Sequence, residues 1–139
     1  MLQFDKLDAV LDRDEKGLPV AYDLQFQPDA TVAHTYCLQN GEDANVHLYI
    51  DVDSENVPIA ISLVHPAARV EYKRIPKSDP VFQHEVSKVY EFACITAKWA
   101  ETMKHGPFVD VTQLRKGVDI VGDTTRRMRD LEQYALATA

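Results

Sequence analysis

The chain has 139 residues, 45% of them hydrophobic and 27% charged, with a formal net charge of −7. These values are typical of one soluble globular domain and exclude a disordered or fibrous chain. Residues 1–60 carry three basic and twelve acidic side chains, a balance of −9, whereas residues 61–139 carry twelve basic and ten acidic ones, a balance of +2. The acidic half argues against nonspecific phosphate binding there.

The composition also predicts the compartment. No apolar run approaches the roughly 18 residues that a membrane helix needs, and the first residues lack the basic start and apolar core of a secretory signal. The two cysteines, Cys37 and Cys94, are too few for a disulfide framework. We therefore expect a cytoplasmic protein with reduced thiols.

Strands are predicted for most of the first half of the chain. One face of a short N-terminal helix would hold Phe4, Leu7, Val10 and Leu11. Apolar and polar residues then alternate, as in half-buried strands, over residues 19–27, 31–39, 46–52 and 57–64. Asn40-Gly41 is a strong hairpin signal. Residues 67–75 suit either a fifth strand or a helical turn, so a meander of four or five antiparallel strands is expected.

The longest periodic run, between Ser78 and Lys104, predicts a long helix. Ser78-Asp79-Pro80 suits a helix start, and His105-Gly106-Pro107 suits a helix end. Spacings of three and four place one stripe of residues on a single face: Phe82, Val86, Val89, Ala93, Thr96, Ala100 and Met103. A second stripe beside it holds Phe92, Ile95 and Trp99. Because two stripes make a wide apolar face, we expect this helix to be covered on more than one side.

A second helical pattern fills the C-terminal part. Asp110-Val111-Thr112-Gln113 resembles a capping box, and a helical stripe follows through Val111, Leu114, Val118, Val121, Thr125, Met128 and Leu131 to Tyr134. Gly117 and Gly122 each cost about 1 kcal/mol inside a helix, so we expect a break near Gly122 with Asp123 capping a separate last helix. The prediction is a single α+β domain, residues 1–139: an acidic, mainly β part (1–76) with an antiparallel meander of four to five strands, packed on the long helix and C-terminal helices of residues 77–139.

No residue pattern specifies a chemistry. His34 and Cys37 are three apart in a strand and point to opposite faces, while His84 and Cys94 lie on different faces of the long helix. Residues 51–55, Asp-Val-Asp-Ser-Glu, resemble a calcium loop that lacks its glycine and its final glutamate. None of the five glycines fits a phosphate-binding loop. We therefore expect no catalytic residue, no cofactor, no metal site and no enzyme.

Two basic clusters leave nucleic-acid binding open as the alternative function. Cationic groups beside an aromatic ring can follow a single-stranded backbone while bases stack, and such a set is formed by Arg69, Tyr72, Lys73, Arg74 and Lys77. The second cluster is Arg126, Arg127 and Arg129. Both clusters are also typical of a solvated rim or helix face. The alternative is therefore a single-stranded DNA-binding regulatory protein.

The apolar surface predicted for the helical half exceeds what one meander can cover. Contiguous apolar patches are rarely exposed on monomers, and a second copy is the simplest cover. We therefore expect a homodimer or higher oligomer, with its contact at Val118, Val121 and Met128.

From Asn45 onward the order of features resembles the tail assembly chaperones of long-tailed bacteriophages. An acidic, turn-containing strand pair spans residues 51–58, an apolar strand spans 59–63 and a short polar-aromatic segment spans 66–72. A helix ending around Trp99 follows, then Pro107-Phe108 and a last helical stretch from Val111. Asn56 stands where glycine is usual in that group, and an extra pair of strands precedes Asn45.

The resemblance implies a non-enzymatic, phage-encoded protein of the host cytoplasm. Its partner would be an aggregation-prone tail tube or tape measure protein, held during virion assembly. A structural connector or tail component of a phage is the third hypothesis, after the chaperone and the single-stranded DNA-binding protein.

Overall fold

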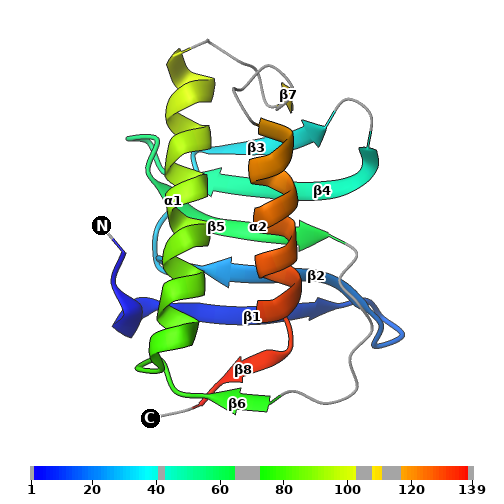
Figure 1. Cartoon of the computed structure of the whole chain (residues 1–139), viewed down its shortest axis with the longest axis vertical. Coiled ribbons are helices and arrows are strands. Elements are labelled where there is room, and N and C mark those ends of the chain that lie inside the picture. Colours follow the sequence, from blue (N-terminus) through cyan, green and yellow to red (C-terminus); the bar gives the residue numbers. More distant parts are fainter. Residues whose placement is uncertain (1, 41–42, 65–72, 103–107, 111–116, 138–139) are drawn as a thin grey trace.

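Two helices lie side by side across one face of an antiparallel sheet (Figure 1). The computed structural model describes residues 2–40, 43–64, 73–102, 108–110 and 117–137, with the backbone alone for 39–40, 43–47, 108–110 and 117–120. The elements are η1 Phe4–Lys6, β1 Asp8–Arg13, β2 Pro19–Gln25, β3 His34–Asn40, β4 Asp43–Val52, β5 Pro58–Val64, β6 Lys73–Ile75, α1 Pro80–Thr102, β7 Phe108–Asp110, α2 Gly117–Leu131 and β8 Tyr134–Leu136. The predicted α+β fold is confirmed.

The strand order of the main sheet is β1-β2-β5-β4-β3-β7, so the meander is not strictly sequential. The hairpin β1–β2 and the meander β3–β4–β5 are each antiparallel, and β5 returns to pair with β2. β7 extends the sheet by pairing parallel to β3. β6 and β8 form a separate parallel pair, which lies beyond β1 in Figure 1. The chain thus inserts its fifth strand between its second and fourth.

The predicted N-terminal helix is wrong beyond one 3-10 turn, because residues 8–13 form strand β1. Pairing with β2 sets Ala9 opposite Leu24 and Leu11 opposite Tyr22. Both Ala9 and Leu11 thereby pack against the core. The spacing of four apolar residues suits a helix or a strand in so short a segment, and the neighbouring strand decided between them.

Helix α1 begins at Pro80, and Asp79 caps its N-terminus. The Asp79 Oδ1 accepts a hydrogen bond of 2.9 Å from the Phe82 backbone N–H. The first predicted stripe is buried over Phe82, Val86, Val89, Ala93, Thr96 and Ala100, and Met103 lies outside the described residues. The second stripe is only partly covered. Phe92 is buried and Trp99 half-buried, but Ile95 is 46% exposed, so the expectation of cover on both sides was too broad.

Helix α2 runs without a break through Gly122 and ends at Leu131, so the predicted break and the helical stripe to Tyr134 are both wrong. Gly122 lies on the exposed side, and Asp123 sits inside the helix rather than at a cap. Burial of Val121, Met128 and Leu131 against the rest of the core outweighs the glycine penalty. Of the predicted capping box, Asp110 belongs to β7 and residues 111–113 lie outside the described part.

The core fills the space between the helices and the inner face of the sheet. Each strand supplies alternate residues to it, as the sequence pattern predicts: Tyr22, Leu24, Tyr36, Leu38, Leu48, Ile50, Val52, Ile61 and Leu63. The end of α2 is tied to the sheet by Tyr22, whose hydroxyl donates to the Leu131 carbonyl at 3.2 Å. In the part of the chain that the structure describes, no helix is long and apolar enough to cross a membrane.

Candidate partner-binding surfaces

The sheet face opposite the helices carries two rows of cross-strand neighbours, one residue from each antiparallel strand. Strand register aligns the first row as Asp8, Gln25, Ala60, Asp51 and Thr35. It aligns the second row as Val10, Asp23, Ser62, Tyr49 and Cys37. Both helices lie on the other face (Figure 1). We call these ten residues, together with the neighbouring Asp12, the open face.

The open face is acidic. Four of its members are aspartates, Asp8, Asp12, Asp23 and Asp51, and none is Lys or Arg. Arg13 follows Asp12 at the strand end, where its Nη1 donates to the Gly17 carbonyl at 2.8 Å. Asp51 accepts a 2.6 Å hydrogen bond from Thr35 Oγ1. The face therefore offers a negative surface of fixed side chains.

Asp23 holds a proton near neutral pH. Burial raises the pKa of its carboxyl to about 7, helped by a hydrogen bond to Asp12 and by the charges of Asp12 and Asp51, while a hydrogen bond from Ser62 opposes the rise. Two carboxyl groups that share a hydrogen bond avoid ionising together. A positive group placed beside Asp23 would favour its ionised form.

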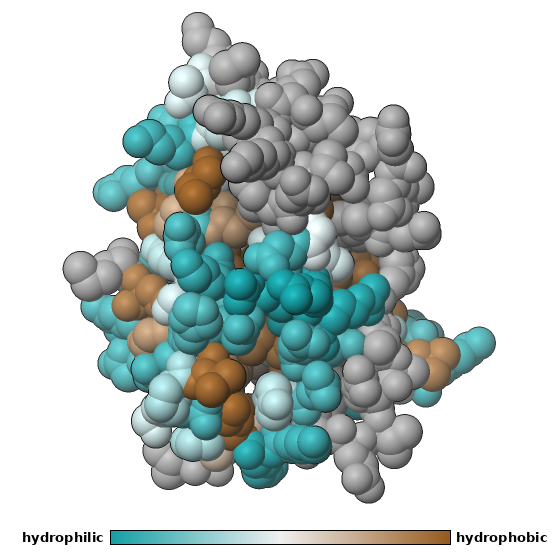
Figure 2. Space-filling model, viewed as in Figure 1, coloured by the Kyte–Doolittle hydropathy of each residue, from teal (hydrophilic) through white to brown (hydrophobic). Residues whose placement is uncertain are grey.

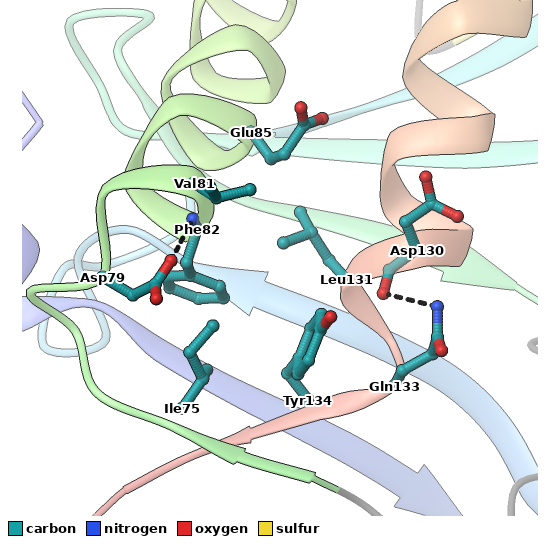
Figure 3. A pocket seen from close by; sticks show the side chains of 9 residues that line it. All are labelled: Ile75, Asp79, Val81, Phe82, Glu85, Asp130, Leu131, Gln133 and Tyr134. Atoms are coloured by element: carbon teal, nitrogen blue, oxygen red, sulfur yellow. Dashed lines mark hydrogen bonds between the residues drawn. The ribbon is translucent and has the colours of Figure 1, made fainter.

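A groove lies between the start of α1, the end of α2 and the β6–β8 pair, with a volume of about 480 Å³. Figure 3 shows its lining: Ile75, Asp79, Val81, Phe82, Glu85, Asp130, Leu131, Gln133 and Tyr134. On the helical face, Figure 2 shows apolar surface below a hydrophilic band, where α1 begins and α2 ends in Figure 1. The groove and the open face are therefore on opposite sides of the molecule.

The structure describes three of the five residues of the nucleic-acid hypothesis. Lys73 and Arg74 are exposed on β6, and Lys77 Nζ donates to the Asp5 carbonyl at 3.1 Å. Arg69 and Tyr72 lie outside the described residues. Nucleic-acid binding stays a prediction, and among the described residues the aromatic neighbour of Lys73 across the β6–β8 pair is Tyr134.

The second basic cluster is engaged within the chain. Arg127 pairs with Asp123 through Nε at 2.9 Å and with Glu85 of α1 through Nη1. Arg126 pairs with the same Asp123 carboxylate, and Arg129 Nη1 lies 4.0 Å from Glu132 Oε2. The Arg127–Glu85 pair joins α2 to α1, whereas the other contacts lie within residues 123–132.

The predicted oligomer contact is wrong for two of its three residues. Val121 and Met128 are both 0% exposed, because α2 packs them into the chain's own core. The side chain of Val118 lies outside the described part. An oligomer stays a prediction, but its contact must use other residues.

The thiols and the calcium-like segment have ordinary structural surroundings. Burial raises the pKa of Cys37 and of Cys94, which disfavours the reactive thiolate. Asp53 Oδ1 accepts hydrogen bonds of 2.9 Å from the backbone N–H groups of Glu55 and Val57, so it shapes the β4–β5 turn. Among the described residues no group of three or more His, Cys, Asp or Glu side chains could hold a metal ion.

The acidic pair on the open face was missed in the sequence. Asp12 and Asp23 are eleven positions apart on different strands, and Asp51 is further still. Asp23 and Asp51 sit at polar positions of alternating patterns, which is the signal that was present, whereas Asp12 follows three consecutive apolar residues. Only the register between β1, β2, β5 and β4 shows that these positions share one face.

Comparison with protein-family models, with curated proteins and with solved structures gave no match. The function of this chain has to be inferred from the chemistry of its own surfaces.

Proposed function

We propose that this protein is a non-enzymatic binding protein that takes a basic protein partner on its open face. The observation that carries the proposal is the Asp12–Asp23 carboxyl pair on β1 and β2, within an open face whose residues include no Lys or Arg. Antiparallel sheets often leave one face to solvent. Here that face has a charge that selects its partner.

Two electrostatic effects favour a cationic side chain at this pair. A Lys or Arg beside Asp12 and Asp23 would meet two carboxyl groups, and its positive charge would oppose the burial that raises the pKa of Asp23. The surrounding aspartates, Asp8 and Asp51, would steer a basic surface toward the same place and disfavour acidic competitors. Ser62 and Ala60, which have small side chains, lie between these aspartates on β5.

The resemblance to phage tail assembly chaperones supplies the class of partner. In that role the partner is a tail tube or tape measure protein, bound in the host cytoplasm before assembly. Phage single-stranded DNA binding through Lys73, Arg74 and Lys77 is the competing hypothesis, and a structural tail component is the third. They differ in what is bound, so one experiment can separate them.

The test is affinity capture with two double variants of equal net charge. Asp8→Lys with Asp12→Lys reverses two charges on the open face. Glu15→Lys with Glu91→Lys reverses two exposed charges elsewhere, in the β1–β2 turn and on the outer side of α1. Tagged full-length chains are used against a co-expressed basic tail tube or tape measure protein, with and without nuclease. Circular dichroism melts show that each variant is folded.

We expect capture by the wild type and by the turn-and-helix variant, and a loss of at least about tenfold for the open-face variant. Nuclease should change nothing. Equal loss in the two variants would show that net charge, and not the open face, governs binding. Capture that disappears with nuclease would favour the nucleic-acid hypothesis instead.

A further inference from the structure

The groove between α1, α2 and β8 combines an apolar centre with an acidic rim. Phe82, Leu131 and Ile75 form its floor, and Val81, 72% exposed, stands at its side. Figure 3 shows the three carboxylates around this centre: Asp79 on one side, Asp130 on the other and Glu85 at the far end. The lining includes no Lys or Arg.

The charges at the rim are not cancelled. Asp79 caps α1, and Glu85 pairs with Arg127, which also serves Asp123. Asp130 is exposed, and its carboxylate has no hydrogen-bond or ion-pair partner among the described residues; only its backbone carbonyl accepts a bond, from Gln133 Nε2 at 3.2 Å. Three carboxylate side chains therefore line the groove, and among the described residues only that of Glu85 pairs with a guanidinium, which it shares with Asp123. The groove attracts cations.

We propose that this groove binds a short segment of a protein partner in which an apolar side chain lies between Lys or Arg side chains. The apolar side chain covers Val81, Phe82 and Leu131, and the flanking cations meet Asp79 and Asp130. A volume of about 480 Å³ accommodates a few side chains. The site is independent of the open face, which lies on the other side of the sheet.

The test adds three hexapeptides with blocked termini, one at a time, to the full ¹⁵N-labelled chain. Binding is monitored by the NMR chemical shifts of the chain. The peptides alternate Arg with Leu, Glu with Leu, and Arg with Ser. We expect saturable shifts at Val81, Glu85 and Tyr134 with the Arg–Leu peptide alone. The amide chemical shifts of Thr35, Asp51 and Ser62 on the open face should not change. The result therefore tests the groove independently of the proposed function.

Matched variants locate the contact. Val81→Ser should lower the affinity for the Arg–Leu peptide about fivefold, because apolar burial is lost. Asp130→Asn should lower it about two- to threefold, because one charge pair is lost. Their controls are Ile95→Ser, at another exposed apolar residue of α1, and Glu91→Gln, at another exposed carboxylate, neither of which should change affinity. The same spectra report whether each variant is folded.

Three results would overturn the proposal. They are equal shifts with the Glu–Leu peptide, shifts that map outside the groove, and no saturable shift with any peptide. Equal weakening by a variant and by its control would overturn it as well.

Discussion

Tyr36 of β3 and Asn56 of the β4–β5 turn are joined by a hydrogen bond of 2.7 Å, donated by the Tyr36 hydroxyl to Asn56 Oδ1. The same Asn56 side chain donates through Nδ2 to the Ala97 carbonyl at 3.0 Å and to Glu101 Oε2 at 2.6 Å. Its backbone has φ +64°, a left-handed conformation that glycine and asparagine adopt most readily. Asn56 therefore holds a backbone conformation that the turn requires, and its side chain also ties the turn to α1.

Replacing Asn56 should separate its two roles. Asn56→Ala loses the hydrogen bonds to the sheet and α1 and strains the left-handed backbone, and should lower the free energy of unfolding by about 2–4 kcal/mol. Asn56→Gly loses the same bonds without the strain, and its loss should be about 1 kcal/mol smaller. Urea denaturation of both variants measures the difference. Equal losses would show that the backbone conformation contributes nothing.

The raised pKa of Asp23 predicts a stability that depends on pH. Below about pH 4 the carboxyl is protonated in both the folded and the unfolded state. Between about 4 and 7 the unfolded state loses the proton while the folded state, with its pKa at about 7, keeps it. The folded state then binds more protons, so Asp23 lowers stability as pH rises through this window, and its effect is constant above it.

Asp23→Asn removes this titration. The variant should be more stable than the wild type at pH 8 by about 1 kcal/mol, a value reduced from the full shift because the side chain is partly exposed and screened. Below about pH 4 the difference should vanish. Asp8→Asn, which removes one charge from the same face, is the control. Thermal melts between pH 4 and 8 measure this difference. If the melting temperatures of the wild type and Asp23→Asn change with pH in the same way, the prediction is refuted.

Replacing the adjacent residues Arg127 and Arg126 tests the ion-pair contact between α1 and α2. Arg127 is mostly buried and joins Asp123 to Glu85 on α1, whereas Arg126 is largely exposed and pairs with Asp123 alone. Arg127→Gln should cost about 1–2 kcal/mol, because it leaves the partly buried Glu85 carboxylate without a cation and breaks the ion pair between α1 and α2. Arg126→Gln should cost less than about 0.5 kcal/mol. Chemical denaturation at low salt compares them, and similar losses would place the contact between helices elsewhere.

Met128 and Ile95 test the assignment of the helical faces. Met128→Ala should destabilise the fold by about 2–4 kcal/mol, since the side chain has no exposed surface and leaves a cavity. Ile95→Ala should cost less than about 1 kcal/mol, because nearly half of that side chain is in water. Light scattering at the same concentrations tells whether either variant changes the oligomeric state. A large loss at Ile95 with a smaller oligomer would show that a second copy covers α1 there.

Much of the fold follows from local patterns in the sequence. Alternation with a period of two predicted β2, β3, β4 and β5, and spacings of three and four predicted α1 and its buried stripe. These predictions succeed because side-chain direction follows directly from backbone geometry, so the pattern of apolar residues reports which face meets the core. The inner face of the sheet could be read from single segments of sequence.

Segment ends and short segments were harder to predict. Residues 8–13 became a strand because β2 offers them a partner, and α2 continued through Gly122 because Val121 and Met128 gained full burial on either side of it. The free energies of local preference at these points are about 1 kcal/mol, smaller than those of burying large side chains. The contacts with other elements therefore decided the outcome.

The sequence by itself determined the helix and strand periodicity, the α+β class and the acidic first half. Only the tertiary structure decided that β5 lies between β2 and β4, which brings Asp12, Asp23 and Asp51 onto one face. It alone set Asp79, just before α1, and Asp130 of α2 around one groove, although they are 51 positions apart in the sequence. The physical reason is that alternation assigns each residue to a face of its own element, whereas neighbours across elements depend on which strands pair and how the helices pack.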